Sequence, residues 1–363
     1  MRRALLVVAA LAVTMLSLVA MAAGQSGQGS NGGNGRAVTY AVIGDTPYGT
    51  PQLENFPNDV AEINADPQVS LAIHLGDIKN GSSQCTTSYF EQIRTDFDDF
   101  EDPLVYTPGD NEWTDCHRAS NGAFWPAGPV LNGDSRPARL GEVRRIFFPN
   151  PGWTLGQNPR RVEKQGGGFP ENVTWSDAGV RFGVVDVPGS NNDWLPWFEQ
   201  PRTTSQVAEV TGRTDADLKW LTRIFNEARD EDASAVAIGI QADMWDPAIE
   251  TESAQYDHFR PIVQRLAQET LRFRRPVLLL NGDSHKFTDD YPLADPARQQ
   301  NKTNYGIGKD VPNLHRITVN GSTTPCHEWL KLTVDPQVAG VFSYQRILFH
   351  KQPGFDPTAC PES

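Results

Sequence analysis

The sequence has 363 residues, with 32 basic and 45 acidic side chains, and its formal net charge is −13. An acidic surface repels the backbones of nucleic acids, so we expect no nucleic-acid partner. An anionic substrate would need local positive charge from metal ions or from a few arginines.

The N-terminal segment has the features of an export signal. Arg2 and Arg3 precede an apolar stretch from Leu5 to Ala23, which ends in small residues. This pattern is typical of a secretory signal peptide, which we place at residues 1–22. An uncleaved anchor is the alternative, because the stretch nearly reaches the ~20 residues that span a bilayer. We expect cleavage, a secreted or extracytoplasmic protein, and no stable membrane insertion afterwards.

Residues 23–36 are predicted to be a flexible linker, because glycine, serine and asparagine dominate their composition. Residues 37–363 contain no internal repeat and no second linker of this kind. We therefore expect this part of the chain to form one domain.

Four cysteines lie in this expected domain: Cys85, Cys116, Cys326 and Cys360. An even number in an exported protein predicts two disulfides, for which three pairings are possible. Proximity along the chain favours Cys85 with Cys116 and Cys326 with Cys360. A zinc site is the competing interpretation, but no Cys-x-x-Cys spacing supports it.

Short apolar runs rich in β-branched residues alternate with helical patterns along the chain. Runs of this kind are typical of strands buried on both faces. We predict strands at 38–43, 69–75, 103–107, 235–240 and 277–281, and antiparallel strands at 316–319, 328–334 and 340–349. We predict helices at 57–66, 88–98, 139–147, 215–230 and 254–272, with Thr214 as N-cap of the fourth. The alternation predicts a layered α/β fold with mixed sheets.

Four of the predicted strands end in Gly-Asp. They place Asp45, Asp77, Asp110 and Asp283 at the carboxyl ends of strands, where ligands bind in layered α/β folds. If these carboxylates converge, cations or protons must offset their repulsion and desolvation. Divalent metal is the usual solution, and His285 adds an imidazole ligand. The alternative is that each aspartate caps a neighbouring helix.

The segments that carry these residues follow one another in a specific order. They read Gly44-Asp45, Gly76-Asp77-Ile78-Lys79-Asn80-Gly81, Gly109-Asp110-Asn111-Glu112 and Gly282-Asp283-Ser284-His285. Over residues 37 to 350 this order resembles the motifs of the calcineurin-like metallophosphoesterase superfamily, which includes the purple acid phosphatases. The resemblance implies an αββα sandwich with mixed sheets and a hydrolase of phosphate esters or anhydrides.

The resemblance also implies two divalent metal ions that share one aspartate. One ion would be held by Asp45, Asp77 and His285. The other ion would be held by Asp77, Asp110, Asp283 and Gln241.

The sequence departs from the family pattern at several positions. Pro47 stands where the Asp-x-His motif has its histidine, and Asp110 replaces a metal-binding asparagine. Asn111 replaces a histidine that assists the leaving group. Gln241 stands in place of a lone histidine, and Asp283 replaces the first histidine of Gly-His-x-His. Oxygen ligands favour harder ions, so magnesium, manganese or calcium gains over zinc, with iron a further candidate.

Asn111 and His117 are the candidate catalytic residues. A structural role for His117 is equally open. His74 lies inside an apolar strand, so we expect a hydrogen-bonded core histidine. Tyr48 and Trp113 flank motif residues and either line the pocket or pack in the core.

The expected function is a secreted, metal-dependent phosphoesterase that acts on a small phosphorylated substrate. The alternative is a catalytically degenerate protein that binds a metal or another ligand on the same scaffold, because three metal-ligand histidines of the pattern are replaced. A carbohydrate-binding module would rest on surface aromatic residues alone.

Overall fold

The computed structural model describes residues 35–118, 121, 135–196, 201–249, 253–324 and 326–351. They fall within a unit that runs from Asn34 to Ser363. The predicted signal peptide, most of the predicted linker and Cys360 lie outside the described residues. Within the described ranges, every helix is too short or too polar to span a bilayer.

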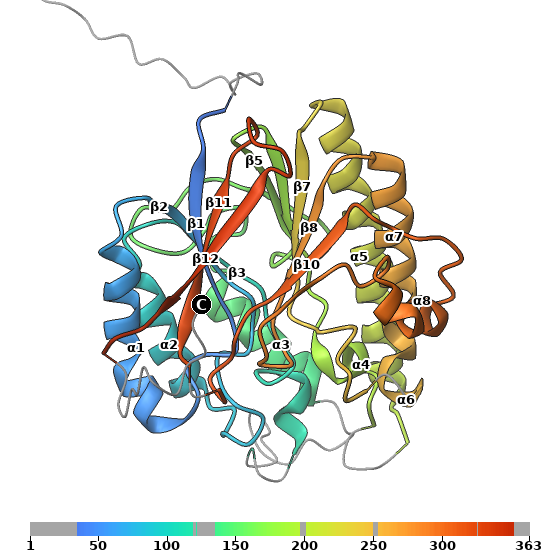
Figure 1. Ribbon diagram of the computed structural model, residues 1–363. Helices are drawn as coiled ribbons and strands as arrows, with labels where there is room; N and C mark the ends of the chain where they lie inside the picture. Colours follow the sequence, from blue (N-terminus) through green and yellow to red (C-terminus); the bar gives the residue numbers. More distant parts are fainter. Residues whose placement is uncertain are drawn as a thin grey trace, which may run out of the picture. The chain divides into compact units, whose positions relative to one another are not determined.

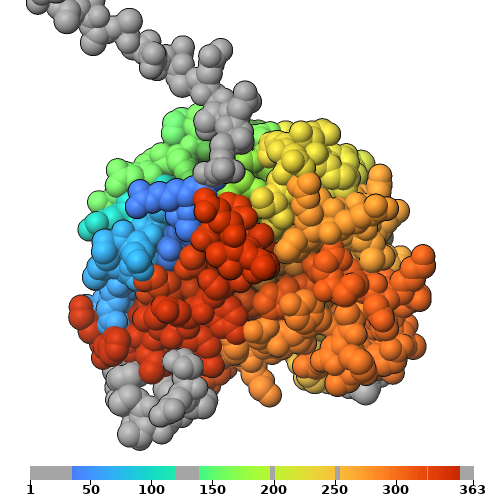
Figure 2. Space-filling view, turned by 45° about the horizontal axis from the view of Figure 1, so that its top comes forward, coloured from blue at the N-terminus to red at the C-terminus, as the bar shows by residue number. Residues whose placement is uncertain are grey.

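The first sheet has the strand order β12-β11-β1-β2-β3 (Figure 1). Its strands are β1 (Val38–Ile43), β2 (Val69–His74), β3 (Leu104–Tyr106), β11 (Glu328–Val334) and β12 (Phe342–Leu348). β1, β2 and β3 are parallel, whereas β11 is antiparallel to both β1 and β12. The pairing of β1 with β11 brings an early and a late segment of the sequence together, and Figure 2 shows red residues of the later segment beside blue residues of the earlier one. The carboxyl ends of the three parallel strands share one edge of this sheet.

The second sheet has the strand order β4-β5-β6-β7-β8-β10-β9. Its strands are β4 (Glu163–Lys164), β5 (Val173–Asp177), β6 (Val180–Val184), β7 (Ala235–Gly239), β8 (Val277–Asn281), β9 (Thr288–Asp290) and β10 (Leu314–Thr318). β6, β7, β8 and β10 are parallel, and β4, β5 and β9 pair antiparallel at the edges. We expected an antiparallel strand at 316–319, and β10 is indeed antiparallel to β9. The expectation is wrong for the pairing of β10 with β8, which is parallel, because the long connection after β8 permits a parallel crossover.

Helices cover the outer faces of both sheets (Figure 1). The longer ones are α1 (Gly49–Asn64), α2 (Thr87–Asp98), α3 (Ser135–Phe147), α5 (Thr204–Asp230) and α7 (Arg260–Phe273). The shorter elements are α4 (Gly189–Asp193), α6 (Ser253–Tyr256), α8 (Gln299–Tyr305), η1 (Thr114–His117), η4 (Asp257–Phe259) and η5 (Pro296–Arg298).

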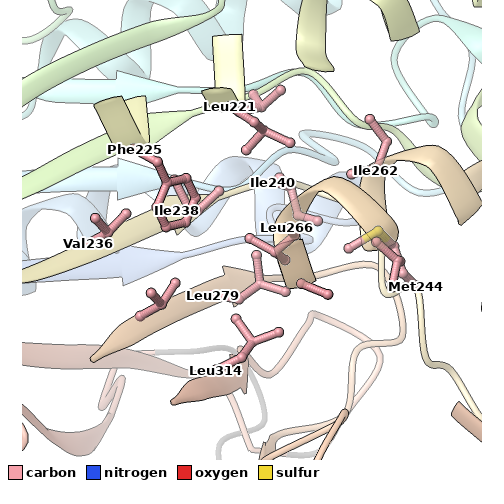
Figure 3. Packing of buried hydrophobic residues seen from close by; sticks show 14 of the residues in the cluster. Leu221, Phe225, Val236, Ile238, Ile240, Met244, Ile262, Leu266, Leu279 and Leu314 are labelled. Atoms are coloured by element: carbon pink, nitrogen blue, oxygen red, sulfur yellow. The ribbon is translucent and has the colours of Figure 1, made fainter. Parts of the chain in front are cut away.

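Three apolar clusters separate four layers. One cluster joins α1, α2 and α3 to the first sheet and includes Phe97. A second lies between the sheets, where Ile73 and Phe182 are buried. The third joins the second sheet to α5 and α7, and Figure 3 shows Ile238 and Leu266 within it. The layers therefore run helix, sheet, sheet, helix, which confirms the predicted αββα fold with mixed sheets.

The sequence patterns placed the starts of α1 and α5 several residues too late, and the helix predicted at 254–272 is divided into α6, η4 and α7. α5 begins at Thr204, where Thr203 caps it by accepting a hydrogen bond from the backbone N–H of Gln206 at 3.1 Å. Thr214 lies inside this helix, so it is not the N-cap. α1 begins at Gly49 and contains Pro57.

Cys85 and Cys116 form a disulfide, as predicted. It joins the loop after β2 to η1, which follows β3. Cys326 is also disulfide-bonded, and its expected partner Cys360 lies outside the described residues.

Replacing both Cys85 and Cys116 by alanine should lower the free energy of unfolding. The bond closes a loop with a sequence separation of 31 residues. In the chain-entropy model, removing a cross-link that closes a loop of this length lowers the free energy of unfolding by on the order of 3–4 kcal/mol. Urea unfolding of wild type and variant, both without reductant, measures the difference. Equal unfolding midpoints and slopes would contradict this expectation.

Candidate metal centre

The carboxyl ends of β1, β2, β3 and β8 bring four aspartates and one histidine together. Two groups form, and in each group the ligand atoms lie within 4.8 Å of one another. The first group is Asp45, Asp77 and His285, and the second is Asp77, Asp110 and Asp283. Either group could hold a metal ion, and Asp77 belongs to both.

Most of these residues have a left-handed backbone conformation. The φ angle is 52° at Asp45, 57° at Asp77, 76° at Asp283 and 62° at His285. For residues other than glycine this conformation is uncommon and costs roughly 1–2 kcal/mol each. Strain of this kind clusters at functional sites, where the surrounding structure holds side chains in position. The turns after three strands are therefore shaped to direct ligand side chains toward one place.

Two glycines let the backbone approach the carboxylates closely. A Cβ at Gly109 would lie 2.1 Å from Asp77 Oδ1, and one at Gly282 would lie 2.3 Å from Asp45 Oδ2. No side chain fits at either position. The backbone N–H of Asp283 is accordingly 3.0 Å from each carboxylate oxygen of Asp45, to which it donates.

The electrostatics of the cluster fit a divalent cation. Burial raises the pKa of the Asp45, Asp77 and Asp283 carboxyls well above their usual range, and the charge of Asp110 raises all three further. Close carboxylates of this kind are stable only when protonated or paired with cations. Oxygen donors of this number and charge suit hard divalent ions.

His285 is oriented for metal binding through one ring nitrogen. Its Nδ1 lies 2.6 Å from the Thr323 hydroxyl, while Nε2 lies 3.4 Å from Asp45 Oδ1 and 3.2 Å from the Tyr48 hydroxyl. Burial lowers the pKa of His285, which favours the neutral ring that coordinates metals. A hydrogen bond on the other nitrogen is the usual way in which proteins orient a histidine ligand.

Asn111 lies within the cluster. Its Nδ2 donates to Asp77 Oδ2 at 2.7 Å and to the Tyr48 hydroxyl at 3.1 Å. His117 instead lines an adjacent recess of about 140 Å³, where its Nδ1 is 2.8 Å from the carbonyl oxygen of Thr114. The structure thus places one predicted catalytic residue against a predicted ligand and the other beside the cluster.

Gln241 is buried next to the second group. Its Oε1 accepts a hydrogen bond from the backbone N–H of Gly189 at 2.5 Å, and its Nε2 lies 3.4 Å from Asp110 Oδ1. In this orientation the side chain donates to a predicted ligand. Its role as a direct metal ligand stays a prediction.

Three further residues lie near the cluster. The sequence alone assigned no role to Ser190 and Lys79, and it left the role of Tyr48 open. Ser190 donates to Asp110 Oδ2 at 2.8 Å, and it follows β6, a strand that the sequence patterns did not identify. Lys79 is buried, and its Nζ donates to the backbone oxygens of Asn80 and Asn111. Tyr48 donates to Asp77 Oδ2 at 3.2 Å, so it contributes to the site.

The aromatic side chains of Trp113 and His74 pack in the core. Trp113 is buried, with the guanidinium of Arg213 5.3 Å from its ring centre. His74 is buried, and its Nε2 lies 2.8 Å from the carbonyl oxygen of Thr46. This burial and this hydrogen bond confirm the predicted core histidine, and burial lowers the pKa of His74 to about 4.

Comparisons with known proteins identify no family. No protein-family model matches the sequence, and no curated protein matches it. One similar solved structure is GAP50, described as the anchor in the inner membrane complex of Plasmodium, at 9% identity and a TM-score of 0.41. The match covers 90% of this chain and 95% of that chain. A likeness at this level carries no inference about the present chain.

The metal-free protein should become less stable between pH 6.5 and 8. The reference pKa of histidine is about 6.5, so an unfolded-state histidine is largely neutral across most of this window. Lys79, whose pKa burial lowers to about 8, begins to lose its proton only at the upper end. Burial raises the pKa of Asp115, beside the cluster, to about 7, and the pKa values of Asp45, Asp77 and Asp283 are also raised. The folded state therefore binds protons that the unfolded state has already lost, and rising pH favours unfolding.

Thermal unfolding in chelator across this window tests the expectation, with Mn²⁺-loaded protein as the comparison. The loss should be smaller when metal replaces the protons. Stability that rises with pH in the chelated protein would show that the carboxylates are not repelling one another as described.

Proposed function

We propose that this chain is a secreted, metal-dependent phosphoesterase with a dinuclear site. The observation that carries the proposal is that Asp77 belongs to two groups of potential ligands at once. Two ions that share one carboxylate form the kind of site that serves displacement at phosphorus. The order of motifs along the sequence supports the same assignment, and the Cys85–Cys116 disulfide suits an oxidising compartment.

The donor set favours manganese or magnesium over zinc. The second group offers carboxylates alone, and the first adds only the imidazole of His285. When bound, such ions would polarise the phosphoryl group and neutralise its developing negative charge.

The side chains around the cluster have separate tasks in this proposal. Asn111 donates to Asp77 and holds its carboxylate in place. Arg118 forms an ion pair with Asp115 at 2.6 Å, and 42% of its side chain is exposed. In this proposal its guanidinium would donate to a phosphoryl oxygen and supply the positive charge that an acidic protein needs for an anionic substrate.

Asn111 also supports an alternative function. An amide donates a hydrogen bond but cannot act as a general acid near neutral pH. A protein that binds metal or another ligand without turnover is therefore the second candidate.

Replacing Asp77 by asparagine should abolish binding of both ions and any hydrolysis, because the shared carboxylate is lost. Elemental analysis of purified protein and a metal-dependent phosphatase assay measure the two effects. Asp98→Asn is the matched control, since Asp98 is an exposed residue of α2 paired with Arg94. A folded Asp77→Asn protein with unchanged metal content would refute the assignment.

Hydrolysis should depend steeply on the leaving group. General acid help is typically worth about 10²–10⁴ in rate, and Asn111 does not provide it. Aryl phosphates and phosphoanhydrides should therefore react faster than alkyl phosphates. A series graded by leaving-group pKa, run on wild type and His117→Ala under conditions where chemistry limits the rate, tests this.

A flat dependence in both proteins would reject the leaving-group argument. A flat dependence in wild type that becomes steep in His117→Ala would identify His117 as the proton donor from the adjacent recess. If no ester reacts although metal is bound, the binding-protein function replaces the phosphoesterase.

A further inference from the structure

A left-handed turn lies beside the second group of ligands. Ser190, Asn191, Asn192 and Asp193 have consecutive φ angles of 51°, 53°, 60° and 63°. Left-handed residues normally occur singly, because each costs roughly 1–2 kcal/mol. Asparagine and aspartate tolerate the conformation better than serine does. A run of four requires strong support from its surroundings.

Buried polar contacts provide that support. Arg213 is almost completely buried and donates to both the side-chain and the backbone oxygen of Asn192. Asn191 donates at 2.8 Å to the carbonyl oxygen of Ala254 and at 2.8 Å to Asp257. These bonds tie the turn to α5 and to the segment before α7. The strain is thus held by contacts with residues other than the proposed ligands.

The ligand side of the turn touches the second group directly. A Cβ at Gly189 would lie 2.8 Å from both Asp110 Oδ2 and Asp283 Oδ1, so only glycine fits. The Ser190 hydroxyl is 2.8 Å from Asp110 Oδ2 and 3.0 Å from Asp115 Oδ1. One hydroxyl hydrogen serves one acceptor at a time, and the shorter contact is the one to Asp110.

We propose that Ser190 is a positioning residue for the second metal group and that the left-handed turn holds it there. The inference rests on the dinuclear site of the proposed function. The first group has its own orienting hydroxyl, that of Thr323 on His285 Nδ1. The Thr323 hydroxyl therefore orients a ligand of the first ion, and the Ser190 hydroxyl orients a ligand of the second. Removing such a contact typically weakens metal binding by about 10–100-fold.

The experiment is a calorimetric titration of the metal-free, full-length protein with Mn²⁺. Wild type should bind two ions, and Asp283→Asn should retain only the event at the first group. Ser190→Gly keeps a residue that accepts positive φ and removes the hydroxyl. In the wild-type background, Ser190→Gly should weaken one of the two Mn²⁺ binding events by about 10–100-fold. In the Asp283→Asn background it should leave the affinity of the remaining event unchanged, because the event at the second group is already lost.

Thr323→Val is the matched control. It removes the orienting hydroxyl of the first group, so it should weaken the event that survives Asp283→Asn. Thermal unfolding of metal-free Ser190→Gly should match wild type, because the strain that glycine relieves at a positive φ is offset by the additional chain entropy that it loses on folding. Unchanged binding in Ser190→Gly overturns the inference. Equal weakening of both events with a loss of stability also overturns it, since that pattern indicates a structural role.

The outcome for Ser190 is separable from that of the phosphoesterase proposal. Two Mn²⁺ events with the expected Ser190→Gly effect, but no hydrolysis of any phosphate ester, leave the positioning role standing and reject the activity. Hydrolysis with two events that Ser190→Gly does not change rejects the positioning role alone. A wild-type protein that binds no Mn²⁺ rejects both.

Discussion

Four carboxylates that repel one another occupy the place where the carboxyl edges of the two sheets meet. Asp45, Asp77 and Asp110 come from the first sheet and Asp283 from the second. Leaving such groups close together and largely out of water is costly unless cations or protons compensate them. The cluster destabilises the protein locally, and the apolar layers described above stabilise the remainder of the fold. The structure is therefore organised around an unfavourable interaction that a bound cation would turn into a favourable one.

The neighbouring structure keeps the carboxylates in place against this repulsion. Backbone N–H groups reach them because glycines leave no side chain in the way, as at Gly109 and Gly282. The disulfide fixes the loops that follow two of the ligand strands. Beneath the cluster, the buried Lys79 places a positive charge near Asp77, Glu112 and Asp115. These contacts hold the carboxylates in place, and an oxygen that accepts one N–H still has a lone pair for a metal ion.

The sequence predicted the parts of the site that depend on local patterns. An apolar run followed by Gly-Asp is visible in the sequence, and parallel strands then bring such ends together, as for Asp45 and Asp77. Ser190 escaped prediction because its position depends on β6 and on a left-handed turn held by the distant Arg213. The extent of α5 was missed for a related reason: its polar first half lacks the apolar periodicity by which helices are found.

The pairing of β1 with β11 has a consequence for the order in which the molecule assembles. β1 supplies Asp45, and its partner on one side comes from the other end of the sequence, with Val38 opposite Val334. Contacts between such distant residues form late in folding, because a long loop must close first. The first ligand group also needs His285, so it is completed only after residues far along the sequence have been synthesised. Metal capture would then follow folding rather than begin it, and the ions would come from the compartment in which folding ends.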